Sequence, residues 1–430
     1  MSATTLVDED GGRETCDPSR TGDSAMATSA RPRATIGYQW FLVGLLSCQS
    51  GILAFDRGTF AFLAPYVRPD LGLNYTQVGW ITSALSMSGA IAGLLVGGLS
   101  DQLGRRKILL VITTVLFSLA SVLSAFARSF LGLFGARLLL GFSAGGGPPI
   151  GQAMVVAEVV PERRGVAQAT IAVCGNLFGG FLAPVLTVGL AQAYGWRTAF
   201  FIAGLPGLAI ALCIFLFLRE VKVERSSQAS RWSGLVELLR DRNILICLAL
   251  AILLVGTGGL GGFLPLYLTE DVGITPNAMK WIMAGAAPAG LICGIGLPFL
   301  SDRFGRKPMM ILAQVVALPG YYFMVESGGS PWLLLIGAVL GASIAGMMPI
   351  ALAIVPAETA GPQRTATALG LTAAVGQFIG GVFVPPIAGR LSDQYGLIVI
   401  PILLMSFAVA ACLLSFAIRE TAPAKLKKAA

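Results

Sequence analysis

An aspartate and an arginine stand side by side at Asp56-Arg57, and no other residue between Trp40 and Pro65 carries a formal charge. A charge near the centre of a lipid bilayer is costly, by roughly 2.5 kcal/mol or more even on lenient scales. Two interpretations follow. In the structural one, the two side chains neutralise each other. In the functional one, they form a site at membrane depth that holds a charged solute or a proton.

In the functional interpretation the two residues have separate roles. The planar guanidinium of Arg57 is suited to bind a carboxylate through two parallel hydrogen bonds. Asp56 is the first candidate for a proton carrier, because it is the carboxylate that lies well inside a predicted span. Gln49 lies seven residues before Asp56, on the same helical face, and is a candidate to hydrogen-bond the solute or Asp56.

The element around this pair must be a membrane helix. The chain has 430 residues, of which 55% are apolar and 12% are charged, and its mean hydropathy is +0.78. Soluble domains carry about 25% charged residues. Apolar runs of about 20 residues recur along the chain, which indicates a helical protein that crosses the bilayer many times, with the lipid as its principal partner.

Composition also excludes several functions. The net charge of +8 would suggest nucleic acid in a soluble protein, but here the basic residues lie in short loops, so no nucleic-acid partner is expected. The chain has no histidine, and its seven cysteines lack metal-ligand spacing, so neither a metal site nor a cofactor is expected. No nucleophile and base stand in a catalytic pattern, so we do not expect an enzyme.

Twelve spans are predicted, in two halves of six. Residues 1–37 are expected to be a disordered cytoplasmic tail, 219–242 a charged cytoplasmic linker and 419–430 a second tail. The predicted bundles are 38–218, with spans at about 38–64, 77–99, 107–127, 130–156, 166–190 and 198–218, and 243–418, with spans at about 243–268, 279–300, 308–326, 332–355, 366–389 and 396–418.

The basic residues of the loops orient these spans. With a cytoplasmic N-terminus, 23 of the 30 Lys and Arg residues fall on the cytoplasmic side and five on the outer side. Since positive loops stay inside, both termini are predicted to be cytoplasmic.

An internal repeat relates the halves. Five residues of the first half recur 201 positions later: Gly89, Gly93, Asp101, Gly104 and Arg105 match Gly290, Gly294, Asp302, Gly305 and Arg306. The fold class is therefore all-α, with twelve transmembrane helices in two pseudo-symmetric halves related by an axis along the membrane normal. Two such halves enclose a midplane cavity and expose it to each side alternately, which predicts a transporter.

The repeated loops also resemble a known family. Residues 97–107 read GGLSDQLGRRK and residues 299–307 read FLSDRFGRK, and both resemble the signature loop of the major facilitator superfamily. The resemblance implies transport by alternating access, and we expect a functional monomer. Charges of these loops and of the end of helix 4 are expected to act as gate or conformational residues: Asp101, Arg105, Arg106, Glu158, Arg163, Asp302 and Arg306.

Two groups of the superfamily share features with the chain. Asp56-Arg57 resembles the pair in the anion:cation symporters, whereas Glu158 and the segment Pro161–Gly165 resemble the aromatic acid:proton symporters. Arg137, four residues before Gly141, is similar to the helix 4 motif whose arginine is linked to proton coupling, and the alternative is that this side chain snorkels to water. The resemblance implies proton-coupled uptake of a small organic anion, an aromatic or a sugar acid.

Further solute contacts are expected at polar residues of several spans. Thr257 and Gly258 stand 201 positions after Asp56 and Arg57, so the second half is uncharged at the matching positions. An uncharged second half suits the body of an amphipathic solute. The candidate contacts are Gln152, Asn176, Tyr267, Gln314 and Gln377, each of which ordinary packing also explains.

Two alternative functions remain open. Efflux of an organic compound is one, although helix 5 (174–184) lacks the Gly-Pro dipeptide usual in the drug–proton antiporters. A membrane sensor is the other, but the short tail and linker leave little sequence for a signalling domain. The compact loops and the resemblance indicate a multi-pass protein of a bacterial inner membrane.

Overall fold

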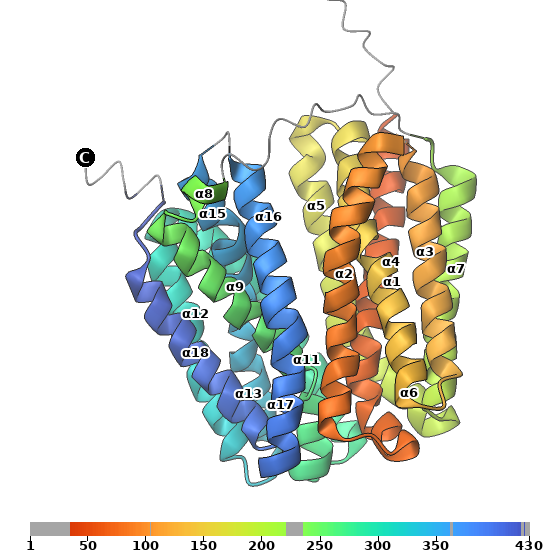
Figure 1. Ribbon diagram of the computed structural model, residues 1–430, viewed down its shortest axis with the longest axis vertical. Coiled ribbons are helices and arrows are strands. Elements are labelled where there is room, and N and C mark those ends of the chain that lie inside the picture. The colour runs from red at the N-terminus through yellow and green to blue at the C-terminus, as the bar shows by residue number, and fades with distance from the viewer. Residues whose placement is uncertain (1–34, 104, 221–234, 362–363, 423–424, 426–430) are drawn as a thin grey trace, which may run out of the picture.

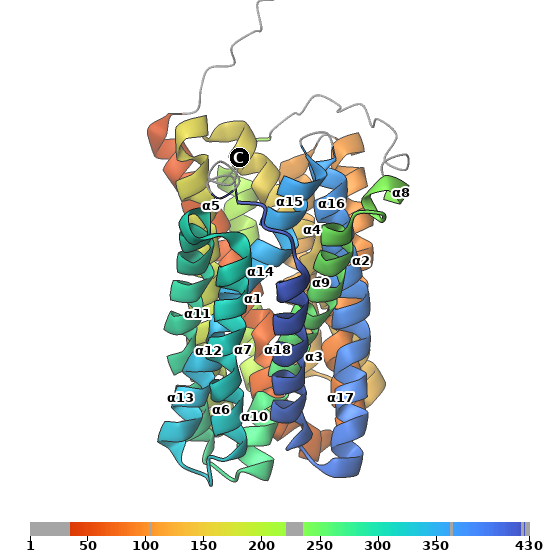
Figure 2. The ribbon, with the colours of Figure 1, turned by 90° about the vertical axis from the view of Figure 1, so that its left-hand side faces the viewer.

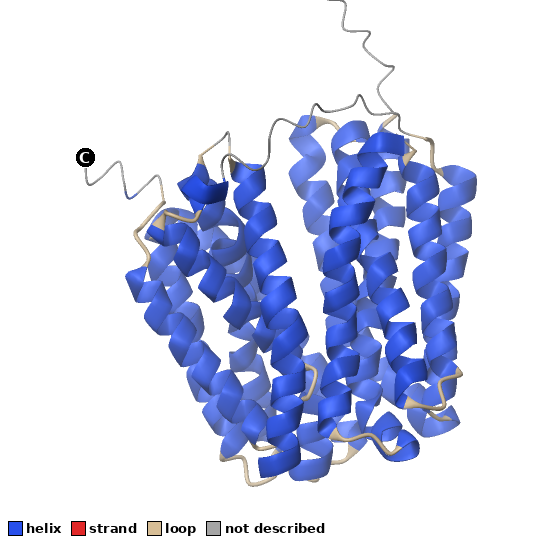
Figure 3. Cartoon of the chain, in the orientation of Figure 1, coloured by secondary structure: helices blue, strands red, loops and turns tan. Residues whose placement is uncertain are grey.

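The structure is a computed structural model that describes residues 35–103, 105–220, 235–361, 364–422 and 425, without the side chains of 94–103 and 235–236. Most of the predicted first tail and of the linker lies outside the described residues. Ile36 and Gly37, at the end of that tail, already belong to the first helix. Throughout the described residues the regular elements are helices (Figure 3).

The first half contains six spans. Its elements are α1 (Ile36–Leu71), α2 (Tyr75–Leu103), α3 (Arg106–Ala125), α4 (Phe130–Glu158), a fifth span made of α5 (Pro161–Asn176), the π-helical turn η2 (Leu177–Leu182) and α6 (Ala183–Tyr194), and α7 (Trp196–Phe217). Each begins and ends within five residues of its predicted span, except that α1 continues seven residues beyond the predicted end at residue 64.

The second half repeats this order after the short helix α8 (Leu235–Leu238). Its spans are α9 (Arg242–Gly261) with α10 (Leu264–Leu266) and η3 (Tyr267–Asp271); α11 (Pro276–Phe304); α12 (Arg306–Val325); α13 (Pro331–Gly341) with η4 (Ala342–Gly346), α14 (Met347–Pro349), η5 (Ile350–Ile354) and α15 (Val355–Ala360); α16 (Thr365–Val375) with η6 (Gly376–Gly381) and α17 (Val382–Tyr395); and α18 (Val399–Ala417).

The predicted fold class is confirmed. Within the described residues, eleven helical segments are long and apolar enough to cross a membrane. The twelfth is α2, which has 29 residues and lies among the others (Figure 1). The two bundles stand side by side, and the described end of the chain lies at the upper end of Figure 1, as does the start of α1.

The halves meet through small residues at positions that the repeat relates. A Cβ atom on Gly180 would lie 2.9 Å from the Cβ of Ala287, and one on Gly381 would lie 2.6 Å from the Oγ of Ser86. Gly180 and Gly381 are 201 residues apart, as are Ser86 and Ala287. Helix η2 therefore approaches α11 as η6 approaches α2, and glycine permits each close approach.

The apolar cores show which end of the molecule is closed. The largest cluster lies toward the lower end and combines both halves, from Phe60 and Ile81 to Phe263 and Tyr267. Toward the upper end each half has its own cluster, one around Leu46 and one around Leu250. Because apolar surface is buried between the halves only below, the structure is closed at the lower end, and the two bundles diverge upward (Figures 1 and 2).

Polar contacts join the halves at the same lower end. The carboxylate of Asp393 accepts hydrogen bonds from the backbone N–H groups of Tyr75 and Thr76, at 2.8 and 2.9 Å, and from the Thr76 hydroxyl at 2.6 Å. Arg68 forms an ion pair with Glu270 at 3.1 Å, and the Tyr75 hydroxyl donates to the same carboxylate at 2.8 Å. Asp393 and Glu270 belong to the second half and their partners to the first.

Candidate substrate and proton sites

Asp56 and Arg57 point into different surroundings. Successive residues of a helix are about 100° apart around its axis. Asp56 is fully buried inside the first half, whereas the Arg57 side chain is exposed and its Nη2 donates to the carbonyl of Ala144 on α4 at 3.4 Å. Among the ion pairs of the described residues none joins the two. The structural interpretation, mutual neutralisation of neighbours, is therefore wrong.

The buried carboxylate belongs to what we call the Asp56 cluster, formed by Asp56, Ser121 and Arg137. The Ser121 hydroxyl donates to Asp56 Oδ1 at 2.6 Å, and Arg137 Nη1 donates to the Asp56 carbonyl at 3.3 Å. The other carboxylate oxygen and two guanidinium nitrogens of Arg137 are buried without a hydrogen-bond partner among the described residues. Buried polar atoms are rarely left unpaired, so this cluster calls for a functional explanation.

Arg137 does not snorkel. Its side chain is 1% exposed, and its guanidinium lies over the rings of Phe200 and Phe60, 4.7 and 5.6 Å from their centroids. The alternative of a side chain that reaches water is therefore wrong. Sequence position indicated an end of the span, but the helix face on which Arg137 lies directs it into the bundle.

Helix α4 packs against α2 along one part of its length and lines a cavity along another. Gly141 and Gly145 pack against α2, where added Cβ atoms would lie 2.5 Å from the carbonyl oxygen of Leu85 and closer still to that of Gly89. Farther along the helix, Pro148 and Gln152 line a cavity. Packing on α2 and lining of the cavity therefore belong to different parts of α4.

A cavity of about 200 Å³ lies between α1, α4 and α5. We call it the glutamine pocket, after Gln49, Gln152 and Gln168 in its wall. The other lining residues are Leu46, Ser50, Leu53, Pro148, Gly151, Ile171 and Ala172. Gln49 is 4% exposed, and its Nε2 donates to Thr114 at 3.5 Å. Gln49 thus contacts α3 and not Asp56, while Gln152 is exposed.

Asn176 and Gln377 occupy matching places, 201 residues apart. Both side chains are exposed, and each lies one turn above a contact between the halves, at Gly180 and Gly381 respectively. Asn176 Nδ2 donates to the carbonyl of Ala172 on its own helix at 3.0 Å, which leaves its amide oxygen as an acceptor. These two amides flank the space between the diverging halves.

Tyr267 and Gln314 are not brought to this space. Tyr267 is 1% exposed, and its hydroxyl donates to the carbonyl of Met324 at 2.8 Å. Gln314 is fully buried between α12 and α14, where its Nε2 lies against the sulfur of Met347. In this conformation both side chains are packed inside the second half.

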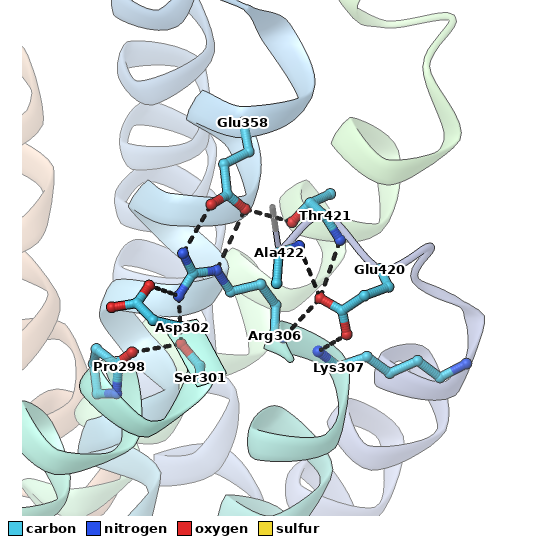
Figure 4. Close-up of polar contacts among 9 residues, drawn as sticks. All are labelled: Pro298, Ser301, Asp302, Arg306, Lys307, Glu358, Glu420, Thr421 and Ala422. Carbon is cyan, nitrogen blue, oxygen red and sulfur yellow. Dashed lines mark hydrogen bonds and ion pairs between the residues drawn. The ribbon is translucent and has the colours of Figure 1, made fainter. Parts of the chain in front are cut away.

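The predicted gate residues of the second half form the Arg306 cluster (Figure 4). Arg306 pairs with Asp302 at 2.6 Å and with Glu358 at 2.8 Å, and it donates to the Ser301 hydroxyl at 2.6 Å. Glu420 accepts from the backbone N–H groups of Arg306 and Lys307, at 2.7 and 3.2 Å, and so caps α12. The cluster ties the upper ends of four spans of one half together.

The first half has a different arrangement at the matching place. Arg106 Nη1 donates to the carbonyl of Ala153 at 3.0 Å, and the backbone of Lys107 donates to Glu220 at 3.0 Å. Arg105 is exposed, and Glu158 and Arg163 are half-buried. The side chain of Asp101 lies outside the described part of the structure.

Several residues of these sites were missed by sequence reasoning. Glu358 and Glu420 stand 200 residues after Glu158 and Glu220, so a gapless comparison at 201 passes over them. A comparison that allowed a shift of one residue at each of these two places would pair them. Ser121, Gln168, Glu270 and Asp393 carry no repeat or motif that sets them apart.

Comparisons with known proteins agree with this architecture. A model of the Major Facilitator Superfamily matches residues 46–267 and 246–430. A probable 4-methylmuconolactone transporter of Cupriavidus pinatubonensis is 30% identical over 369 residues, 82% of this chain and 84% of that protein. The 3-(3-hydroxy-phenyl)propionate transporter of Escherichia coli is 29% identical and covers 85% of this chain and 88% of its own.

Solved structures show the same fold. A bacterial homolog of the human lysosomal transporter Spinster matches with a TM-score of 0.74 at 17% identity, over 89% of this chain and 97% of its own. The nucleoside transporter NupG matches with a TM-score of 0.71 at 15% identity, over 87% and 98%. At these identities the likeness extends to the fold alone.

Proposed function

The chain belongs to the major facilitator superfamily, and we propose that it is a proton-coupled symporter that takes up a small organic acid anion. The observation that carries this proposal is the placement of Arg57. Its side chain is exposed and contacts α4, one helical turn from Leu53 in the wall of an amide-lined cavity, while its neighbour Asp56 is withdrawn into the bundle. Relatives named as transporters of a muconolactone and of a phenylpropionate support a small organic solute.

Arg57 is the anchor for the carboxylate in this proposal. Its present partner is a single carbonyl, that of Ala144 at 3.4 Å, which is a long hydrogen bond that an incoming carboxylate can replace. A charge-assisted bidentate pair is stronger than the neutral contact it displaces. The matching positions of the second half, Thr257 and Gly258, are uncharged, and the Thr257 hydroxyl donates to the carbonyl of Leu253 on its own helix at 2.8 Å, so the proposed charged anchor belongs to the first half.

The Asp56 cluster is the proposed proton site. A carboxylate with one oxygen unpaired has room for a proton on that oxygen, and Arg137 holds the backbone of the same residue through its hydrogen bond to the Asp56 carbonyl. Asp56 and Arg57 are adjacent in the chain, so a movement of α1 on anion binding reaches both. That adjacency would couple binding of the anion at Arg57 to the protonation state of the Asp56 carboxylate.

The orientation of the protein in the membrane follows from its basic loops. The upper end carries most of the Lys and Arg residues and would be cytoplasmic, so that the described conformation, closed below, faces inward. Opening to the outside requires that the Asp393 and Glu270 contacts break. The Arg306 cluster lies within one half and would hold that half rigid while the halves rock. A bacterial inner membrane and a functional monomer complete the proposal.

Uptake of labelled organic acids into proteoliposomes, with and without an inward proton gradient, tests this function. Wild-type protein should concentrate the acid only under the gradient. Arg57→Ala should abolish uptake, and Arg57→Lys should restore it weakly, because a lysine lacks the planar fork. Asp56→Asn should lose accumulation and retain exchange of labelled for unlabelled acid. If Asp56→Asn still concentrates the acid under the gradient, Asp56 is not the coupling acid.

The same assay decides between uptake and efflux. Under the same inward proton gradient, an efflux protein would expel the acid from preloaded liposomes and would not concentrate it inside. A strain without it would become sensitive to the compound and would not lose growth on it.

A further inference from the structure

We propose that the glutamine pocket is the distal half of the solute site and that it selects organic monoanions whose far end carries a neutral hydrogen-bonding group, such as a hydroxyl or carbonyl. This inference rests on the proposed function, in which Arg57 binds the carboxylate. It concerns the part of the solute that lies beyond the carboxylate and does not contact Arg57.

The pocket and Arg57 lie on one continuous face. On α1, Arg57, Leu53, Ser50 and Leu46 follow at steps of four, three and four, which places them on one side of a helix. On α4, the Arg57 contact Ala144 lies one turn from Pro148 and two turns from Gln152. Leu53, Ser50, Leu46, Pro148 and Gln152 all line the pocket.

This face sets the length of the solute. Eight residues separate Ala144 from Gln152 and Arg57 from Gln49, which corresponds to a rise of about 12 Å. A carboxylate at Arg57 therefore leaves room for a body against Leu53 and Pro148 before the amides are reached. The volume of about 200 Å³ is that of about seven water molecules, which suits a small solute.

The chemistry of the wall sets the class of group at the far end. Three amides supply donors and acceptors, Ser50 supplies a hydroxyl, and none of the ten lining residues is charged. A hydroxyl or carbonyl can be paired there. A second carboxylate would enter a largely apolar pocket without a cation, at a cost in desolvation that its hydrogen bonds do not repay.

Gln49 makes the pocket a built site. It is 4% exposed, and its hydrogen bond to Thr114 on α3 holds the amide against the pocket wall. Gln152 is exposed on α4 and Gln168 half-buried on α5, so the three amides come from three helices. Removing the amide of Gln152 or Gln168 leaves the hydrogen bond of Gln49 in place.

Competition binding to the purified full-length protein tests the inference, with three probes that differ only at the far end. They are 3-phenylpropionate, 3-(4-hydroxyphenyl)propionate and 3-(4-carboxyphenyl)propionate. One or two neutral hydrogen bonds predict that the hydroxylated probe binds about 3- to 30-fold more tightly than the unsubstituted one. The dianion should bind at least about tenfold more weakly than the hydroxylated probe.

Two variants isolate the pocket. In the double variant Gln152→Leu with Gln168→Leu, the gap between the hydroxylated and unsubstituted probes should shrink to within about twofold, while the unsubstituted probe still binds. Binding of that probe also shows that the variant is folded. Gln192→Leu, in an exposed glutamine of the same half far from the pocket, should keep the full gap. Gln152→Lys should raise the affinity for the dianion above that for the hydroxylated probe.

The outcomes separate this inference from the proposed function. If Arg57→Ala leaves the binding of all three probes unchanged, the proposed function fails and the inference fails with it. If Arg57→Ala abolishes binding but the double variant keeps the full gap, or Gln152→Lys leaves the order of the probes unchanged, the function stands and the glutamine pocket is not the distal subsite.

Discussion

Asp393 offers a direct way to change the balance between the closed and open states of the lower end. Its carboxylate caps the N-terminus of α2 from the other half, through Tyr75 N–H at 2.8 Å, Thr76 N–H at 2.9 Å and the Thr76 hydroxyl at 2.6 Å. These hydrogen bonds exist only while the halves touch below. We therefore expect Asp393→Ala to weaken the closed state and to leave the open state unchanged.

The size of the effect follows from the capping energy. Replacing an N-cap aspartate by alanine costs about 0.5–2 kcal/mol. Asp393 is exposed, so its removal buries no further polar group. The backbone N–H groups that lose their acceptor can bind water once the halves part. Because the whole loss falls on the closed state, the ratio of open to closed molecules should rise about 2- to 30-fold.

Alkylation of a single cysteine measures this ratio. Ser86 lies against Gly381 where the halves meet, so Ser86→Cys, in a chain with its seven cysteines replaced, is shielded from the lower side while that end is closed. A membrane-impermeant maleimide added on the outer side should label it about 2- to 30-fold faster in Asp393→Ala. Asp393→Asn should label at an intermediate rate, because its single amide oxygen replaces only one of the two carboxylate oxygens that accept from Tyr75 and Thr76.

Asp70 provides the matched control. Its carboxylate also lies at the lower end, but it pairs with Arg197 of the same half at 2.7 Å. Asp70→Ala should therefore leave the labelling rate unchanged. Equal rates in Asp393→Ala and wild type, or equal increases in Asp393→Ala and Asp70→Ala, would refute the reasoning.

Three further predictions concern other parts of the molecule. Arg306→Gln should lower the free energy of unfolding by about 1–3 kcal/mol, measured by thermal unfolding in detergent, because it leaves Glu358 half-buried without its cation. Arg364→Gln breaks only the exposed pair with Glu237 and should cost less than about 0.5 kcal/mol. Gly381→Val should slow transport, since its Cβ would lie 2.6 Å from Ser86 Oγ, whereas Gly370→Val, with nothing within 4 Å, should be tolerated. Ser121→Ala removes a hydroxyl that donates to Asp56 at 2.6 Å and should reduce accumulation of the acid under a proton gradient more than exchange of labelled for unlabelled acid, because the proposed proton-carrying carboxylate loses the group that holds it in place.

Much of the fold could be predicted from the sequence, because the sequence contains apolar runs of membrane length and a gapless internal repeat. The proximity of Asp302 to Arg306 could also be predicted, because Asp302 lies near the end of one helix and Arg306 at the start of the next. The contacts of Asp393 and Glu270 could not. They depend on how closely the two halves approach, and no local pattern records that distance.

The candidate site was predicted in part. The charge of Arg57 sets it apart in an apolar span, and in the structure its side chain is exposed and contacts α4. The separation of Asp56 from Arg57 and the burial of Arg137 depend on the rotation of α1 and α4 about their axes, which α3 and α7 fix through Ser121 and Phe200. Tyr267 and Gln314 face the interior of their own half for the same reason.

The central claim is that Arg57 anchors a carboxylate whose entry is coupled to a proton. The most direct test is accumulation of a labelled organic acid in proteoliposomes under an imposed proton gradient, with wild-type protein beside Arg57→Ala and Asp56→Asn. We expect accumulation by the wild type alone, exchange without accumulation by Asp56→Asn, and neither activity by Arg57→Ala. Accumulation by Arg57→Ala at the wild-type level would contradict it.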